Sequence, residues 1–288
     1  MAQQDELEDP AWLKELLPRR IVYATSGMEQ VKVQKNLIYK QVAEKELKAD
    51  VYTPINPGNN MCHPAVIFIH GGYLPPNLLT QPKDWGVYIS YGQLLAASGF
   101  VGVTFNHRYY GWDYLDEAQS DVNDLITFIR DNAEMLSIDK EKICLWAFSG
   151  GGPFLSQAMC DTPAYIRCLV SYYAILDLQH LRQDIPTTVT DETLRKFSPV
   201  YQIGSKRKGI APIFIARAGL DNPGLNEAVD RFLQTALTNN MTIDFSNHAE
   251  GHHAFDILDD NERTREIIRR TIDFIAANES SNYPLQAA

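Results

Sequence analysis

Ser149 stands among small residues that follow an apolar segment, and this setting is typical of a catalytic nucleophile. Residues 143–146 are apolar, and residues 150–152 are all glycine. The pattern predicts a strand, a sharp turn and a helix, because small neighbours let the backbone turn tightly and expose the hydroxyl. Ala147 takes the place of the first Gly in G-x-S-x-G. Since a Ser among glycines is also typical of ordinary tight turns, the assignment depends on finding its partners.

A seryl hydroxyl becomes a useful nucleophile only beside a base, and the base needs an acid that orients it. The favoured base is His253, which follows the last predicted strand in the segment Gly-His-His-Ala-Phe over residues 251–255. Its neighbour His252 is the alternative. We favour His253 because Phe255, two residues further on, can anchor this segment in the core. The other histidines considered are interpreted as surface or structural residues: His63, His107, His180 and His248.

The favoured acid is Asp221, which follows the apolar run 211–216. Asp-Asn-Pro-Gly over residues 221–224 is also an ordinary turn sequence. Asp177, just after the run 168–173, is the alternative, and Asp244 is disfavoured because it lies inside a predicted strand.

A negatively charged oxygen forms during acyl transfer and needs hydrogen-bond donors. His70-Gly71-Gly72-Tyr73 follows the first strongly apolar strand, where glycines let backbone amides face a ligand. We predict donors from Gly72 or Tyr73 and from Gly150, the residue after the nucleophile. The alternative is a simple strand-to-loop turn in which His70 hydrogen-bonds the loop backbone.

The elements that must position these residues alternate along the chain. Apolar runs at 64–69, 100–105, 143–148, 168–173 and 211–216 are typical of parallel strands that are buried on both faces. Helical patterns cover 86–98, 117–136, 152–160, 225–238 and 261–277, and residues 241–245 alternate like an outer strand. This order predicts an α/β protein with a doubly wound sheet and helices on both faces. Every candidate site residue follows a strand, at the edge where such sheets bind ligands.

The chain is predicted to form one domain over residues 1–288, in which period-two strands within 21–53 precede the apolar runs. Residues 1–20 form an N-terminal extension with a helix at 9–17, for which Asp9 is the expected N-cap. The irregular stretch 174–205 either caps the strand ends or is a connection with one helix near 191–197.

Composition bounds the partners and the compartment. The chain of 288 residues has 26 basic and 36 acidic side chains and a net charge of −10, which argues against nucleic acid and anionic membrane as partners. Lys206-Arg207-Lys208 is interpreted as a solvated loop. Four cysteines without a CxxC pair predict a reducing compartment. An acidic start without a leader pattern, and no apolar run near 18 residues, predict a cytoplasmic protein.

With these motifs in hand, the chain resembles an α/β-hydrolase-fold serine esterase, near the hormone-sensitive-lipase-like and dienelactone-hydrolase-like carboxylesterases. The resemblance runs from about residue 36 and rests on His70-Gly71-Gly72, the run 137–143, the Ser149 turn, Gly219-Leu220-Asp221 and the segment 251–255. The order Ser149, Asp221, His253 is that of this fold. The resemblance implies eight mostly parallel strands with one antiparallel, and an acyl-enzyme reaction. Ala147 and Tyr73 depart from the family pattern.

The expected function is hydrolysis of a small ester through acyl-Ser149, with no cofactor and no metal. An amidase, an arylformamidase or a peptidase-like hydrolase would use the same triad, and a non-catalytic ligand-binding homologue is a further alternative. A set of aromatic residues suggests an apolar or aromatic substrate, although tyrosines also fill cores and surfaces: Tyr73, Trp85, Tyr88, Tyr91, Tyr109, Tyr110, Trp112, Tyr114, Tyr172 and Tyr173. The sequence does not indicate an oligomeric state.

Overall fold

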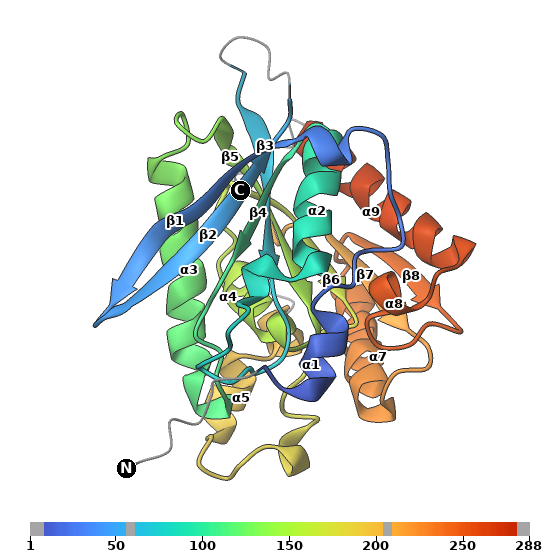
Figure 1. Ribbon diagram of the computed structural model, residues 1–288. Coiled ribbons are helices and arrows are strands. Elements are labelled where there is room, and N and C mark those ends of the chain that lie inside the picture. Colours follow the sequence, from blue (N-terminus) through green and yellow to red (C-terminus); the bar gives the residue numbers. More distant parts are fainter. Residues whose placement is uncertain (1–8, 56–60, 204–208, 281–288) are drawn as a thin grey trace.

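The computed structural model describes residues 9–55, 61–203 and 209–280, and within them eight strands form one sheet (Figure 1). The strands are β1 (Lys32–Val42), β2 (Lys45–Thr53), β3 (His63–Ile69), β4 (Val101–Phe105), β5 (Ile138–Phe148), β6 (Ile166–Tyr172), β7 (Ile213–Ala218) and β8 (Ile243–His248). They lie in the order β1-β2-β4-β3-β5-β6-β7-β8. Only β2 runs antiparallel to its neighbours β1 and β4. The predicted doubly wound, mostly parallel sheet is confirmed.

Helices cover both faces of this sheet. The α-helices are α1 (Ala11–Leu16), α2 (Gly86–Ala97), α3 (Leu115–Asp131), α4 (Ser156–Cys160), α5 (Asp191–Lys196), α6 (Pro199–Gln202), α7 (Pro223–Thr238), α8 (Phe255–Leu258) and α9 (Glu262–Ser280). Short 3-10 turns are η1 (Met28–Gln30), η2 (Pro82–Asp84), η3 (Trp112–Tyr114), η4 (Ser149–Leu155) and η5 (Arg182–Asp184). Helices α2 and α9 pack on one face, and α3, α4 and α7 on the other.

The apolar strand runs build two cores because successive side chains of a strand point to opposite faces. In β3, Ile67 packs into the core under α3, whereas its neighbour Phe68 packs into the core under α2 and α9. In β5, Leu145 likewise packs into the core under α3, and Trp146 packs into the core under α2 and α9. A sheet that is buried on both faces leaves its carboxyl edge as the place where loops can gather polar groups.

The helix expected at 152–160 is shorter than predicted. Residues Ser149–Leu155 form the 3-10 turn η4, and the α-helix α4 begins only at Ser156. Pro153 lies inside η4 and lacks the amide hydrogen that an α-helix needs. Three preceding glycines lower the helix propensity further.

The N-terminal helix differs from the prediction in its cap. Pro10 precedes the first helical residue and makes no side-chain cap. The Asp9 carboxylate instead accepts hydrogen bonds from the amides of Leu79 at 2.8 Å and Thr80 at 3.2 Å. The N-cap prediction for Asp9 is therefore wrong, because its carboxylate binds the loop that follows the His70–Tyr73 segment. Leu13 contacts the same loop.

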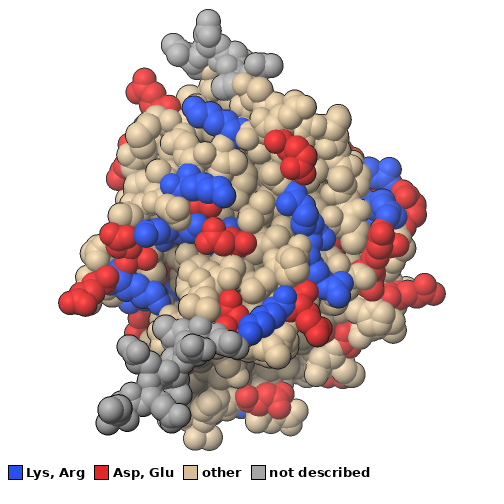
Figure 2. Space-filling model, viewed as in Figure 1, with Lys and Arg blue, Asp and Glu red and all other residues tan. Residues whose placement is uncertain are grey.

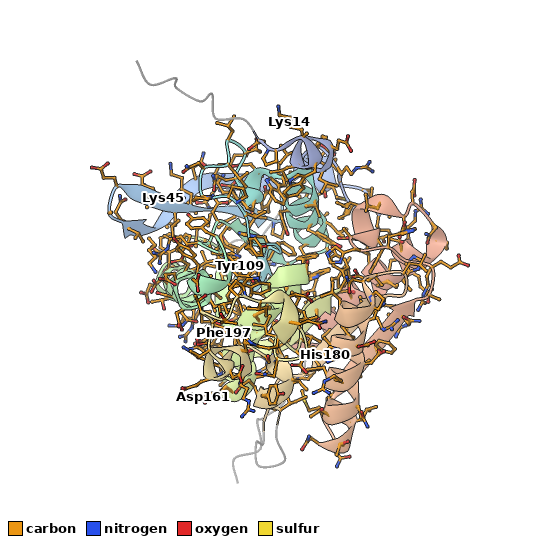
Figure 3. The ribbon with its side chains drawn as sticks, turned by 90° about the horizontal axis from the view of Figure 1, so that it is seen from below. Lys14, Lys45, Tyr109, Asp161, His180 and Phe197 are labelled. Carbon is orange, nitrogen blue, oxygen red and sulfur yellow. The ribbon has the colours of Figure 1, made fainter. Side chains whose placement is uncertain are left out.

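The stretch 174–205 holds η5, α5 and α6. It contacts the start of α3 through an ion pair between Lys196 and Asp116, and η3 through Thr188, whose hydroxyl lies 3.1 Å from an Asp113 oxygen. Figure 3 looks onto this side of the molecule from below, with Phe197 and His180 of the stretch on one side of Tyr109 and Lys14 of α1 on the other. Lys206-Arg207-Lys208 and residues 1–8 lie outside the described residues.

On the face seen in Figure 2, basic and acidic side chains are interspersed. No disulfide joins the described cysteines, and Cys144 and Cys168 are buried on the neighbouring strands β5 and β6.

Candidate active site

Ser149 follows β5 directly and has a left-handed backbone, with φ of 49°. Such a conformation is uncommon for a residue other than Gly, and where it persists the surrounding structure must enforce it. The carbonyl of Ser149 accepts a hydrogen bond from the amide of Ile175 at 2.9 Å. A Cβ at Gly71 would lie 2.7 Å from the Cβ of Ser149, so only Gly allows this approach. The turn thus holds the hydroxyl at the carboxyl edge of the sheet.

The imidazole of His253 lies between Ser149 and Asp221. Its Nε2 is 2.9 Å from the Ser149 Oγ, and its Nδ1 is 2.7 Å from an Asp221 carboxylate oxygen. With the proton on Nδ1, the ring donates to Asp221 and accepts from the seryl hydroxyl, which is the arrangement a base needs. The Asp221 side chain is 6% exposed and that of His253 is 40% exposed. The structure thus brings together the three residues that were predicted as nucleophile, acid and base.

The loops that carry the acid and the base are hydrogen-bonded to each other. The amide of Leu220 donates to the carbonyl of Gly251, and the amide of Gly219 donates to the carbonyl of His248. Phe255 is fully buried just after His253. Ala254 between them is left-handed, with φ of 60°. This turn lets Phe255 enter the core while His253 stays at the sheet edge.

The alternative residues have other partners. His252 is paired with Asp259, at 2.9 Å from its Nδ1, and its side chain is 61% exposed. Asp177 is fully buried and forms an ion pair with Arg231 at 2.9 Å. In the described chain neither is hydrogen-bonded to Ser149, whose hydroxyl is paired with His253. Asp244 is exposed on β8.

The segment predicted to supply oxyanion donors lies against the nucleophile turn. Gly72 is left-handed, with φ of 80°. A Cβ at Gly150 would lie 2.7 Å from the Gly72 carbonyl oxygen and 3.0 Å from its nitrogen. In the described chain, the amides of Gly72 and Tyr73 donate no backbone hydrogen bond. Gly72, Tyr73 and Gly150 therefore stay our predicted donors for a developing oxyanion.

We expect Gly150→Ala to lower kcat by 10²- to 10³-fold, the usual cost of one lost oxyanion donor. The added methyl would collide with the Gly72 backbone, so the two segments must move apart. Steady-state kinetics on the folded variant measure the effect. Gly111→Ala is the matched control, because a Cβ there meets only Tyr114, at 4.0 Å. An unchanged kcat in folded Gly150→Ala would remove this segment from the mechanism.

Two buried histidines stack behind the Gly71–Gly72 segment. The rings of His70 and His107 lie 3.7 Å apart at 22°, and the Nδ1 of His70 is 3.0 Å from the Gly71 carbonyl oxygen. Burial lowers the pKa of His70 to about 4. Burial and the neighbouring His70 lower the pKa of His107 well below its usual value. Both rings are therefore neutral near pH 7.

Acid should destabilise the protein through this pair. The unfolded chain binds a proton at His70 near pH 6.5, whereas the folded chain binds it only near pH 4. The free energy of unfolding is therefore unaffected by His70 above pH 6.5 and decreases as the pH falls towards 4. His70 alone accounts for about 3 kcal/mol. Urea unfolding between pH 7 and 4 should show a steeper loss for the wild type than for His107→Phe, which keeps an aromatic ring in the stack. Equal slopes would contradict this assignment.

The predicted aromatic residues differ in burial, with Tyr109 in the core and Tyr73 exposed. Tyr88, Tyr91, Tyr172 and Tyr173 are buried core residues. Tyr73 is 55% exposed, and its ring lies 5.6 Å from that of Trp112 and 6.3 Å from that of Tyr109. This group of three, which we call the aromatic wall, adjoins the oxyanion segment.

Sequence reasoning missed Asp256. Its carboxylate is fully buried and accepts hydrogen bonds from the phenols of Tyr173 at 2.7 Å and Tyr91 at 2.8 Å. The Tyr173 ring in turn lies 4.8 Å from the ring of His253. The one available signal was an acidic residue between the apolar Phe255 and Ile257.

A separate cavity of about 500 Å³ lies between α3, α4, α5 and α6. Phe197, Tyr201 and Gln119 are among its lining residues, which include none of Ser149, Asp221 and His253.

In the described part of the chain, no group of three or more His, Cys, Asp or Glu residues is placed to hold a metal. Over the same residues, no helix has both the length and the apolar character that crossing a bilayer requires.

The chain is similar to known proteins in part of its sequence and in its fold. Residues 49–183 match the model of the BD-FAE family. Esterase 2 of Thermogutta terrifontis, phosphoramylated by tabun, has a TM-score of 0.68 and 18% identity, covering 87% of this chain and 95% of that one. The butyrate-bound form of the same esterase gives a TM-score of 0.67 and 18% identity, covering 88% and 98%.

The form of that esterase phosphorylated by paraoxon gives a TM-score of 0.65 and 18% identity, covering 86% of this chain and 92% of that one. A search of the curated proteins found no match. At these identities the likeness shows a shared fold, and it confirms the resemblance to the α/β-hydrolase fold.

Proposed function

We propose that this protein, which has the α/β-hydrolase fold, is a serine esterase that cleaves small carboxylic esters through an acyl-Ser149 intermediate. The observation that carries the proposal is the imidazole of His253, whose two nitrogens lie 2.9 Å from the Ser149 hydroxyl and 2.7 Å from the Asp221 carboxylate. A hydroxyl, a base and an orienting acid in this geometry are what nucleophilic acyl transfer requires.

The reaction proceeds in two halves. His253 takes the Ser149 proton while the oxygen attacks the ester carbonyl, and the amides of Gly72 or Tyr73 and Gly150 bind the resulting oxyanion. His253 then gives the proton to the leaving alcohol, and the acyl group stays on Ser149. Water attacks this acyl-enzyme with His253 again as base, and the carboxylic acid leaves. Asp221 holds the ring orientation and stabilises the imidazolium.

The substrate is proposed to be a small ester with an apolar or aromatic group. Within the aromatic wall, the exposed Tyr73 and the half-buried Trp112 offer an apolar surface to one side of the ester, and the buried Tyr109 supports both rings from the core. A related structure by fold is described as butyrate-bound and another as propionate-bound, which supports short acyl chains.

We propose that the stretch 174–205 contributes a small cap to a single domain. Ring contacts run from Tyr109 to Phe154 and on to Phe197 of this stretch, which supports a position next to the aromatic wall. We also propose a cytoplasmic location, because the four cysteines of the sequence include no CxxC pair and the described cysteines form no disulfide.

A panel of p-nitrophenyl esters and matched p-nitroanilides tests the proposed reaction. We expect turnover of the acetyl and butyryl esters and little or none of the anilides. Faster turnover of the anilides would favour the amidase alternative. Absence of both activities in folded protein would favour a ligand-binding protein.

A further inference from the structure

We infer that Tyr173 and Asp256 form a second support for His253, which positions the imidazole and stabilises its protonated form during the reaction. This inference rests on the proposed function, because it assigns a role in the same proton transfer. In the described chain neither side chain is hydrogen-bonded to the predicted nucleophile or oxyanion donors, so both act through His253 as positioning residues.

Tyr173 is held firmly in an unfavourable backbone conformation. It follows β6 with φ of 39°, which is uncommon for a bulky residue. Its amide donates to the carbonyl of Ala216 at 2.8 Å, and its hydroxyl donates to Asp256 at 2.7 Å. These two hydrogen bonds hold the ring against His253, with centroids 4.8 Å apart and planes at 58°. Strain of this kind persists where the surroundings fix the residue, and it concentrates at functional sites.

Asp256 is a buried carboxylate whose hydrogen-bond partners are neutral phenols. In the described residues, no Lys or Arg forms an ion pair with it, and its two oxygens accept from Tyr173 and Tyr91. The pKa of Asp256 lies above its usual value, because burial raises it by more than the phenols and the attraction of His253 lower it. An uncompensated buried charge is costly, so the carboxylate needs a compensating positive group.

The titratable groups around this carboxylate come from three elements. They are Tyr88 and Tyr91 of α2, Tyr172 at the end of β6 with Tyr173 after it, and His253 just before α8. Burial raises the pKa of each of these tyrosines, which keeps their phenols neutral hydrogen-bond donors. Of this set, only His253 can carry a positive charge.

His253 acquires this positive charge during the reaction, when it takes the Ser149 proton. When the Ser149 proton moves to the Nε2 of His253, the ring becomes an imidazolium that is paired with Asp221 at Nδ1. The electron-rich ring of Tyr173 attracts this cation, and the carboxylate behind it adds a second anion. Removing Asp256 should therefore weaken the transition state and make His253 harder to protonate.

The test is the pH profile of kcat/KM for Asp256→Asn, with Tyr173→Phe as a second variant that keeps the ring. We expect Asp256→Asn to lower the plateau of kcat/KM about tenfold and to move the acidic limb about one pH unit lower. A tenfold loss of imidazolium stability weakens the transition state and shifts the protonation of His253 by the same factor. Tyr173→Phe should move the limb in the same direction by less. Tyr91→Phe is the matched control, because it also removes one phenol from Asp256 but its ring contacts Phe68, Trp146 and Phe148 and not His253.

We expect Tyr173→Phe to lower kcat/KM more than Tyr91→Phe. A lower plateau with an unmoved acidic limb in both Asp256→Asn and Tyr173→Phe would show a merely structural role and overturn the inference. If the wild type hydrolyses no ester, the proposed function fails, yet NMR titration of the His253 ring still tests the coupling. Its resonances should titrate at lower pH in Asp256→Asn than in the wild type, and coincident titrations would overturn the inference independently of activity.

Discussion

Ser149→Ala is expected to lower kcat on the folded protein by a factor on the order of 10⁶. The variant removes the oxygen that would form the acyl bond, 2.9 Å from the Nε2 of His253. The remaining amides of the oxyanion segment would still bind the substrate carbonyl. A residual rate on the order of 10³ above the reaction in water is therefore expected. Hydrolysis of p-nitrophenyl butyrate, with a correction for traces of wild-type enzyme, measures the effect.

Ser156→Ala is the matched control for this variant. Ser156 is buried at the start of α4, seven residues after Ser149, and its hydroxyl has no hydrogen-bond partner in the described chain. Its removal should leave kcat within a few-fold of the wild type. Retention of most activity by Ser149→Ala would show that another residue attacks the ester.

His253→Ala is expected to lower kcat by a similar factor, on the order of 10⁶. Without the imidazole, no other group of the described residues is hydrogen-bonded to the Ser149 hydroxyl to take its proton, and the Asp221 carboxylate loses its bond to Nδ1. The double variant Ser149→Ala/His253→Ala should be scarcely slower than either single variant, because nucleophile and base act as one unit. Kinetics of the three variants on the same ester measure this non-additivity.

The neighbouring residue gives a close control. His252→Ala removes an imidazole that is exposed and paired with Asp259, and it should leave kcat nearly unchanged. If His252→Ala lost activity while His253→Ala kept it, the base would be His252 and our assignment of His253 would be wrong.

The fold followed from the sequence because its signals are local. Runs such as residues 64–69 are apolar on both faces, and only a sheet between two helical layers buries both. The one antiparallel strand, β2, agrees with the resemblance to the family. The left-handed Ser149 turn follows from its glycine neighbours, whereas the 3-10 form of η4 depends on Pro153 and was not predicted.

The arrangement of the site was foreseeable in part. Chain order and strand ends indicated Ser149, Asp221 and His253, and the structure brings their side chains within hydrogen-bond distance. Their catalytic roles stay predictions. Asp256 could not be assigned, because its partners Tyr91 and Tyr173 lie 165 and 83 residues away and only the folded chain brings them together.

The stacking of His70 on His107 could not be predicted from the sequence either, because only the folded chain brings the two rings together. The two rings are contributed by segments after β3 and β4, which are neighbours in the sheet but separated by α2 in the chain. No periodicity or spacing in the sequence indicates that two histidines will share one buried stack.

Covalent labelling tests the central claim most directly. We would incubate the full chain with paraoxon, the compound named for one phosphorylated structural neighbour, and locate the adduct by peptide mass spectrometry. The account predicts one phosphoryl group per chain on Ser149, with loss of esterase activity in proportion to labelling, and no adduct in Ser149→Ala. Folded wild-type protein that stays unlabelled, or that carries the adduct on a different residue, would contradict it.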